Sequence, residues 1–296
     1  MRCFLVVALV AGLSACSMTP ELQRPAPPVP ASFAEAAALQ GAAVPASEMG
    51  WRTMFADPQL QRLIELALVH NRDLRLAALN VDAARSMFNI QQSTRLPSVS
   101  LDASRTRERA LAQDNSGESR REVSNQVAVN VGVSAFELDL FGRVRSLSDA
   151  ALARYLASEQ GRDAAQISLI GAVADAYFAR QLADEQRQLA QRTLKDWQQS
   201  LKLARLLQDA KQNSGLDVAQ AEGQVASAEA DLQARQRAYV QAGNALQLLV
   251  GAELPADLPA ARELARQPLV VPLPAGLHSD MLLVRPDIRQ AEQTLS

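Results

Sequence analysis

The sequence has little cysteine, few aromatic residues and no excess of basic charge. Its only cysteines are Cys3 and Cys16, and its formal net charge is -2. Without a basic excess the chain has little with which to neutralise phosphates, which argues against a nucleic-acid partner. Aromatic residues make up only 4% of the chain, whereas Ala, Leu, Gln and Arg abound. This composition favours long, thin helical packing over a thick globular core.

Proline is missing from the middle of the chain. None occurs between Pro97 and Pro255. Because proline disrupts helices more than any other residue, so long a stretch without it favours very long helices. Several prolines gather instead near the N-terminus, at Pro20, Pro25, Pro27, Pro28 and Pro30. They predict an extended tether with little capacity to form a core.

The first residues have the pattern of an export signal. Arg2 supplies a positive charge, and the apolar run Phe4–Leu13 is too short for a membrane-spanning helix, which needs about 20 residues. Such a run, followed by small residues, is typical of a cleaved signal peptide. Its removal would take Cys3 away, so that the mature chain could form no internal disulfide.

The end of this signal, Leu13-Ser14-Ala15-Cys16, resembles the bacterial lipobox. The resemblance implies cleavage before Cys16, which would then carry lipid, palmitate included, on its thioether and its new amine. The next residue is Ser17 rather than Asp, and similarity to sorted lipoproteins then implies the outer membrane. The alternative is an ordinary signal peptide followed by a chance cysteine.

Helical patterns begin after the tether. Asp57-Pro58 predicts a helix start, with Asp57 as the N-cap and Pro58 in the first turn. The apolar face of this helix is predicted to be Leu60, Leu63, Ile64, Ala67 and Leu68. After a break near Asn71, a stripe with coiled-coil spacing follows at Leu74, Ala77, Val81, Ala84 and Phe88.

The period changes to two residues after Pro97. Small polar residues alternate with apolar ones at Val99, Leu101, Ala103, Val127, Val129, Val131 and Val133. The pattern predicts two strands joined by a polar loop, each with one apolar and one polar face. Alternation over about ten residues matches a transmembrane strand between lipid and water. A soluble hairpin packed on a helix fits the alternation at least as well.

Two long helices are predicted next. The first runs from after Gly142 to about Asn213, roughly 105 Å if continuous, and Asn213-Ser214-Gly215 forms the turn. The second helix has Asp217 in its first turn. It carries a stripe, interrupted at Arg235, of Val218, Ala221, Val225, Ala228, Leu232, Tyr239, Ala242, Leu246 and Leu249. A Pro-rich connector from Pro255 to Pro274 follows.

Two short segments repeat one another. Asp287–Ala291 (DIRQA) echoes Asp73–Ala77 (DLRLA). The echo lies where a second copy of the helix–strand–helix unit would begin. Two strands alone cannot close a barrel in lipid. The sequence is therefore expected to be a fragment that forms no pore by itself.

Four segments together resemble the TolC-like outer-membrane factors, specifically the lipoprotein branch that serves RND-type multidrug efflux pumps. They are WRTMFADPQLQRLIELALVHNRDL from Trp51, ELDLFGRVR from Glu137, GLDVAQAE from Gly215 and LPAGLHSDMLLVRPDIRQAE from Leu273. The resemblance implies a homotrimer when full length. Each full protomer would give four strands to a shared β-barrel and several helices to a shared periplasmic α-barrel.

The resemblance also implies a function without catalysis and without a cofactor. The channel would be the passive exit duct of a tripartite pump, with a periplasmic adaptor protein, an inner-membrane pump and outer-membrane lipid as partners. The gate and adaptor tip would be Ser214, Gly215, Leu216 and Asp217. Asp217 alternatively serves as a favourable charge at a helix N-terminus. Where this family usually has Gly, the chain has Lys211, so the shape and charge of the turn are expected to differ.

The expected fold class is mainly α with a transmembrane β-hairpin, in which long antiparallel coiled-coil-like helices belong to an α-barrel and two strands to a trimeric β-barrel. The expected division is a signal peptide at 1–15, a lipidated tether at 16–50, first-repeat helices at 51–96, an outer-membrane β-hairpin at 97–137, a periplasmic helical hairpin at 138–251, a connector at 252–284 and the truncated start of a second repeat at 285–296.

Two other classes of protein, an adaptor lipoprotein and an enzyme, fit the sequence less well. A periplasmic adaptor lipoprotein also has a long helical hairpin, but no strand-rich blocks flank these helices. An enzyme is disfavoured because the only histidines, His70 and His278, have neither metal-ligand spacing nor a nucleophile arrangement. No metal site is expected.

Overall fold

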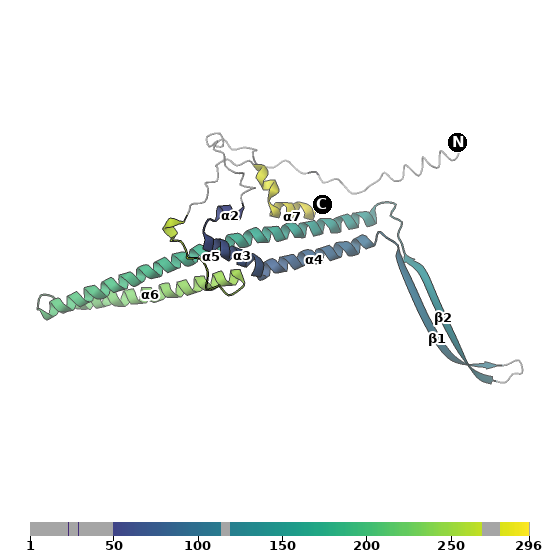
Figure 1. Cartoon of the computed structure of the whole chain (residues 1–296), viewed down its shortest axis with the longest axis horizontal. Coiled ribbons are helices and arrows are strands. Elements are labelled where there is room, and N and C mark those ends of the chain that lie inside the picture. Colours follow the sequence, from purple (N-terminus) through teal and green to yellow (C-terminus); the bar gives the residue numbers. More distant parts are fainter. Residues whose placement is uncertain (1–22, 24–28, 30–49, 114–118, 268–278, 296) are drawn as a thin grey trace. The chain divides into compact units, whose positions relative to one another are not determined.

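The computed structural model describes residues 23, 29, 50–113, 119–267 and 279–295. The chain divides into two compact units. The larger described part of one unit is Val81–Ala157, and the other unit contains the described residues of Ala26–Asn80 and Ser158–Glu292. Figure 1 shows long helices and one β-hairpin, so the expected fold class of a mainly helical chain with two antiparallel strands is confirmed. No helix in the described ranges is both long and apolar enough to cross a membrane.

Helix α3, Pro58–His70, begins and ends as the sequence predicts. Asp57 is its N-cap and accepts a hydrogen bond from the Gln59 N–H at 2.8 Å, with Pro58 in the first turn. Asn71 ends α3 and also starts α4, Arg72–Ser93, because its side-chain oxygen accepts from the Leu74 N–H at 2.9 Å. The Asn71 amide donates to the Leu249 carbonyl at 2.8 Å. The break between α3 and α4 is therefore hydrogen-bonded to the end of a helix that is far away in the sequence.

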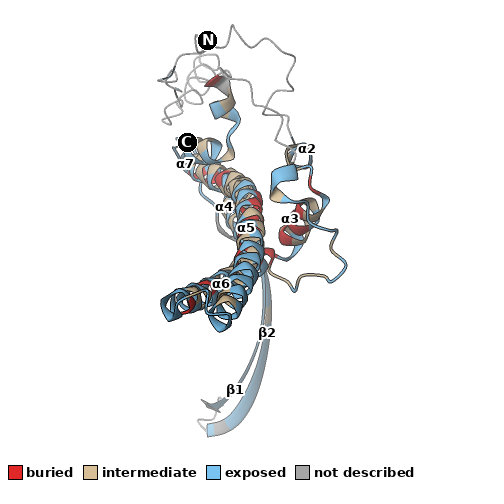
Figure 2. Cartoon of the chain, turned by 90° about the vertical axis from the view of Figure 1, so that its left-hand side faces the viewer, coloured by how far each residue is buried: buried red, intermediate tan, exposed pale blue. Residues whose placement is uncertain are grey.

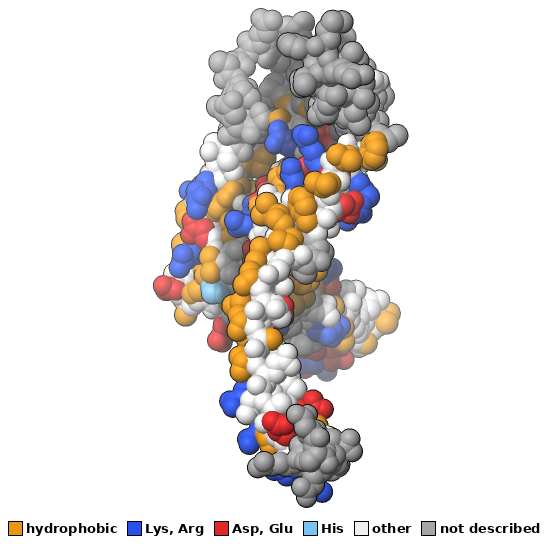
Figure 3. Space-filling model, turned by 90° about the vertical axis from the view of Figure 1, so that its right-hand side faces the viewer, with side chains coloured by type: hydrophobic (Ala, Val, Ile, Leu, Met, Phe, Trp, Pro, Cys, Tyr) orange, Lys and Arg blue, Asp and Glu red, His pale blue; other side chains and the backbone are white. Residues whose placement is uncertain are grey.

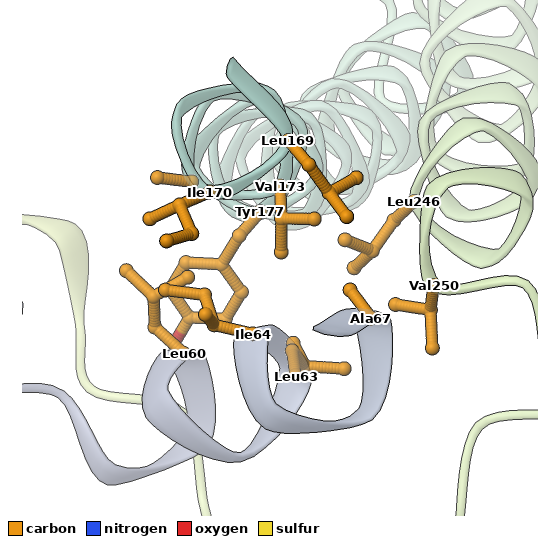
Figure 4. Close-up of a cluster of buried hydrophobic side chains, with 11 residues drawn as sticks. Leu60, Leu63, Ile64, Ala67, Leu169, Ile170, Val173, Tyr177, Leu246 and Val250 are labelled. Carbon is orange, nitrogen blue, oxygen red and sulfur yellow. The ribbon is translucent and has the colours of Figure 1, made fainter. Parts of the chain in front are cut away.

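The main core lies where α3 meets two long helices, α5 (Arg143–Asp209) and α6 (Gly215–Val250). Figure 4 shows side chains from all three helices pointing toward one another. The buried residues of this core are Leu60, Leu63, Ile64 and Ala67 of α3, Leu169, Ile170, Val173, Ala174 and Tyr177 of α5, and Leu246 and Val250 of α6. Fully burying each larger aliphatic side chain contributes about 1.5–3 kcal/mol. The face predicted for α3 is thus the face that packs.

Elsewhere the helices bury only narrow stripes. The predicted stripe of α6 is buried or half-buried throughout, and the interrupting Arg235 lies outside, where it pairs with Asp231 at 3.2 Å and donates to Gln186 of α5. The stripe predicted for α4 is likewise its less exposed face. Figure 2 shows these buried positions as scattered red patches along mostly blue and tan helices. Trp197 of α5 is 38% exposed.

The strands are longer than the alternating stretches that predicted them. β1 is Ser98–Gln113 and β2 is Ser119–Ala135, and they pair antiparallel with Leu101 opposite Val131. The arginine-rich half of β1 is strand as well, although its sequence does not alternate between apolar and polar residues. Pairing with β2 satisfies its backbone groups, which outweighs the weak local pattern.

Short elements complete the fold. α2 is Trp51–Met54, and the 3-10 helices η2 and η3 are Leu264–Arg266 and Ser279–Val284. α7 is Pro286–Leu295. The two echoing segments both lie at helix starts, because Asp73 is in the first turn of α4 and Asp287 in that of α7.

Gly251 ends α6 in a conformation that only glycine adopts easily. Its φ is 75°, in the left-handed region, and a Cβ there would lie 2.5 Å from the His70 carbonyl oxygen. A side chain at this position would therefore be unfavourable for two reasons, the left-handed backbone conformation and a clash with the end of α3.

We predict that Gly251→Ala lowers the free energy of unfolding by more than the about 1–2 kcal/mol that the left-handed conformation alone costs. Gly223→Ala is the matched control, since nothing lies within 4 Å of its added Cβ and the position is inside α6. The control should be neutral or stabilising by about 0.5–1 kcal/mol. Thermal unfolding followed by circular dichroism compares the two, and equal midpoints would contradict the packing described.

Candidate functional site

The β-hairpin has two chemically different faces. The register places Val99 opposite Val133, Leu101 opposite Val131 and Ala103 opposite Val129, and directly paired residues share a face. The larger apolar side chains of this face are Val99, Leu101, Val127, Val129, Val131 and Val133, and each is 61–72% exposed. The opposite face carries Ser100, Asp102, Ser104, Asn130 and Gly132. Within the compact unit that contains the hairpin, no described helix covers this face, which disfavours the alternative of a hairpin packed on a helix.

Figure 3 shows the apolar side chains as a continuous column along the hairpin. A continuous apolar surface on a protein marks an interaction site rather than ordinary exposure. Alternation of apolar and polar residues over this length fits contact with lipid on one side and water on the other.

The turn that leads from β2 into α5 is fixed by two carboxylates. Glu137 accepts from both sides of the Arg143 guanidinium, with 2.9 Å between Nε and Oε1. Asp139 accepts from the Arg145 N–H at 2.8 Å and so caps α5. Backbone hydrogen bonds, the one from Arg145 foremost, hold the pKa of Asp139 below its usual value. The ELDLFGRVR segment is thus a helix-capping structure.

The turn between α5 and α6 closes α5 with a Schellman motif. The Gln212 N–H donates to the Leu207 carbonyl and the Lys211 N–H to the Gln208 carbonyl, both at 2.8 Å. Lys211 occupies the left-handed position with φ of 59°, and in the described ranges no other residue besides glycine has a positive φ. A left-handed residue at this position is the conformation that glycine adopts at least cost, so the expected difference at Lys211 falls on a backbone position that favours glycine.

The four residues predicted as the tip lie together at the start of α6. Ser214 is the N-cap, and Ser214 and Asp217 form a reciprocal capping box with Oγ to Oδ2 2.6 Å and Ser214 N to Oδ2 3.0 Å. Hydrogen bonds from Ser214 lower the pKa of the Asp217 carboxyl. Leu216, between them, is 66% exposed. The geometry gives Asp217 a capping role, while its gating role stays a prediction.

A buried polar cluster was missed by the sequence analysis. Asp57, 2% exposed, accepts from the Tyr177 hydroxyl at 2.7 Å and from the Gln267 side-chain amide at 2.8 Å, in addition to its cap. Burial alone would raise the pKa of Asp57, but the donors Gln267 and Tyr177 and two backbone N–H groups hold it below its usual value. Burial and the neighbouring Asp57 raise the pKa of Tyr177. The cluster ties α3, α5 and the connector together.

Two predictions concern Cys16 and a metal site. Cys16 lies outside the described residues, as does His278, so lipidation stays a prediction. Within the described ranges, no group of three His, Cys, Asp or Glu side chains is placed to hold a metal ion.

A hairpin with one apolar and one polar face, joined to a 67-residue helix, is the architecture expected of a segment of a membrane-channel wall. The family model for outer membrane efflux proteins matches residues 63–252. The chain therefore belongs to the outer membrane efflux protein family, and the expected family resemblance and outer-membrane location are confirmed.

Individual relatives support membership of this family. The probable efflux pump outer membrane protein TtgC of Pseudomonas putida is 44% identical over 287 residues, which cover 96% of this chain and 59% of that protein. The cation efflux system protein CusC of Escherichia coli is 40% identical, covering 96% of this chain and 60% of that protein. The open-state MtrE outer membrane channel of Neisseria gonorrhoeae superposes with a TM-score of 0.79 at 41% identity, covering 95% of this chain and 61% of that one. The chain thus spans about three fifths of the length of the relatives it matches. These relatives are efflux proteins rather than enzymes.

We predict that Lys211→Gly stabilises the turn by about 1 kcal/mol, since glycine avoids the cost of a Cβ in the left-handed region. Amide hydrogen exchange at Leu207 to Asp217 should slow about fivefold. Lys211→Ala is the control, because it removes the same charge but keeps the Cβ, and its exchange should be nearly unchanged. Equal slowing in both variants would show that charge rather than backbone conformation limits the turn.

Proposed function

We propose that this protein is a subunit of the outer-membrane channel of a tripartite efflux pump and acts as a passive exit duct. The observation that carries the proposal is the hairpin, whose apolar face is exposed along its length while its opposite face is polar. In the proposed assembly, the apolar face contacts lipid, the polar face lines a water-filled lumen, and α4, α5 and α6 form the periplasmic wall. The chain itself catalyses no reaction.

The proposed assembly is a homotrimer that receives its cargo from a periplasmic adaptor and an inner-membrane pump. The division into anchored tether, membrane hairpin, periplasmic helical hairpin and connector belongs to this proposal. Lipid on Cys16 would act as an accessory tether, because a closed barrel holds itself in the membrane.

The relatives' names support a duct without strong selectivity. Relatives that are 40–44% identical to this chain are named for antibiotic, toluene and cation efflux. Compounds so different in charge and size share little chemistry that one narrow binding site could recognise. We therefore assign selectivity to the pump.

Deleting the complete gene should raise the intracellular accumulation of a fluorescent pump substrate, provided that the partner pump is expressed. Complementation then tests the two faces with adjacent residues. Val131→Lys should fail to restore efflux, since a cation on the lipid side costs about 2–4 kcal/mol near the bilayer centre. Asn130→Lys, one residue away on the opposite face, should restore it. Unchanged accumulation after deletion, or equal behaviour of the two variants, would refute the assignment.

The tip residues allow a separate test of gating. Ser214→Ala breaks the capping box but keeps the Asp217 charge, whereas Asp217→Asn removes the charge. If the charge holds the tip closed, single-channel conductance of the protein from its complete gene should rise in Asp217→Asn and stay near wild type in Ser214→Ala. Wild-type conductance in Asp217→Asn would refute the gating role and show that Asp217 serves only as a helix cap.

A further inference from the structure

The apolar column of the hairpin continues into a row of arginines. Side chains on one face recur every second residue, so Arg105, Arg107 and Arg109 follow Val99, Leu101 and Ala103 on the same face of β1. Arg121 of β2 lies opposite Leu111 and extends the row by one more step. All four arginines are exposed, and successive members are about 7 Å apart along the strand. Figure 3 shows basic side chains following the apolar column toward the loop.

In the described part of the hairpin, no acidic residue lies on the same face as the row. The described acidic residues of the hairpin, Asp102, Glu108 and Glu122, fall on the opposite face. Among the described residues, none of the four guanidinium groups takes part in an ion pair. Like charges on one face of a sheet repel one another, so this arrangement is unfavourable unless anions lie against it.

The position of the row indicates which anions these are. On β1, Arg105 directly follows the apolar residues Val99, Leu101 and Ala103 of this face. Val127 and Val123 of β2 lie opposite Arg105 and Arg109, and Leu111 lies opposite Arg121. The row therefore begins where the wholly apolar part of the face ends, and its arginines have apolar neighbours on the other strand. The row lies on the loop side of that column, and α4 and α5 join the strands at the other end. If the helices are periplasmic, as the proposed function requires, the row lies at the outer leaflet.

We propose that Arg105, Arg107, Arg109 and Arg121 form a binding row for the phosphate groups of anionic lipids in the outer leaflet. This inference rests on the proposed function. A guanidinium group matches a phosphate with two parallel hydrogen bonds, and long basic side chains at the membrane boundary reach the head groups while their stems stay in the apolar layer. The row thereby anchors the hairpin at a fixed depth.

The test uses purified protein from the complete gene in neutral detergent micelles, titrated with bisphosphorylated lipid A and followed by calorimetry. Basic residues near an anionic lipid surface each contribute about a fivefold effect on binding. The fourfold variant R105Q/R107Q/R109Q/R121Q should therefore bind more than about 100-fold more weakly. The corresponding fourfold lysine variant keeps the charge but loses the two-pronged geometry, and should bind with intermediate affinity.

A control variant, R72Q/R75Q/R85Q/R237Q, removes the same total charge from exposed helix positions and should bind lipid A like the wild type. Dephosphorylated lipid A should bind weakly to all variants, and inorganic phosphate should not compete at equal concentration. Wild-type affinity in the glutamine row variant, an equal loss in the control, or full competition by inorganic phosphate would each overturn the proposal. Conductance of each variant is measured in parallel, so that loss of lipid binding with an intact pore is distinguished from failure of the proposed channel function.

Discussion

The packing of α3 against α5 and α6 is the contact on which the helical part of this protein depends. Two long antiparallel helices alone bury one stripe each, which leaves most of their surface exposed. Adding the four buried side chains of α3 creates a large enclosed cluster among the described residues, which Tyr177 joins from α5 and Leu246 and Val250 join from α6. Around it, Asp57, Asn71 and Gly251 hold the helix ends by capping, by a long-range hydrogen bond and by close approach.

The wall of a duct likewise requires that only a few side chains are buried. A wall one helix thick must present one surface to a lumen and another to its surroundings, so it cannot bury most of its side chains. The helices accordingly carry narrow stripes of small residues such as Ala221 and Ala228, and the hairpin buries almost nothing. In the proposed assembly, the stability that a globular protein draws from its own core has two other sources, neighbouring subunits and lipid. The proposed trimer supplies the first and the proposed membrane contact the second.

Much of this fold followed from periodicity. The Asp57 cap, the break at Asn71, the stripe of α6 and the alternation of the strands were read from local patterns, because each is decided by residues within a few positions of one another. The capping box at Ser214 and Asp217 is equally local. The position of Lys211, where the sequence analysis expected an altered turn, has a left-handed backbone.

Long-range contacts were not predictable in this way. Nothing near Tyr177 or Gln267 in the sequence indicates that both bond to Asp57, since the three residues are brought together only by packing. The arginine half of β1 lies within the expected hairpin but lacks the alternating pattern, because its strand is imposed by pairing with β2, and the face of each arginine becomes known only from the register. The ion pair of Glu137 and Arg143 depends on the turn at Gly142, whose φ is 77°.

The central claim is that the hairpin separates lipid from water. The most direct test attaches a spin label to a single cysteine, introduced by Val131→Cys or by Asn130→Cys. Each variant is made in the protein from its complete gene and is measured in outer-membrane vesicles. The account predicts that the label at 131 collides mainly with oxygen, which concentrates in lipid, and the label at 130 mainly with a water-soluble nickel chelate. Labels with the same preference at both adjacent positions would contradict it.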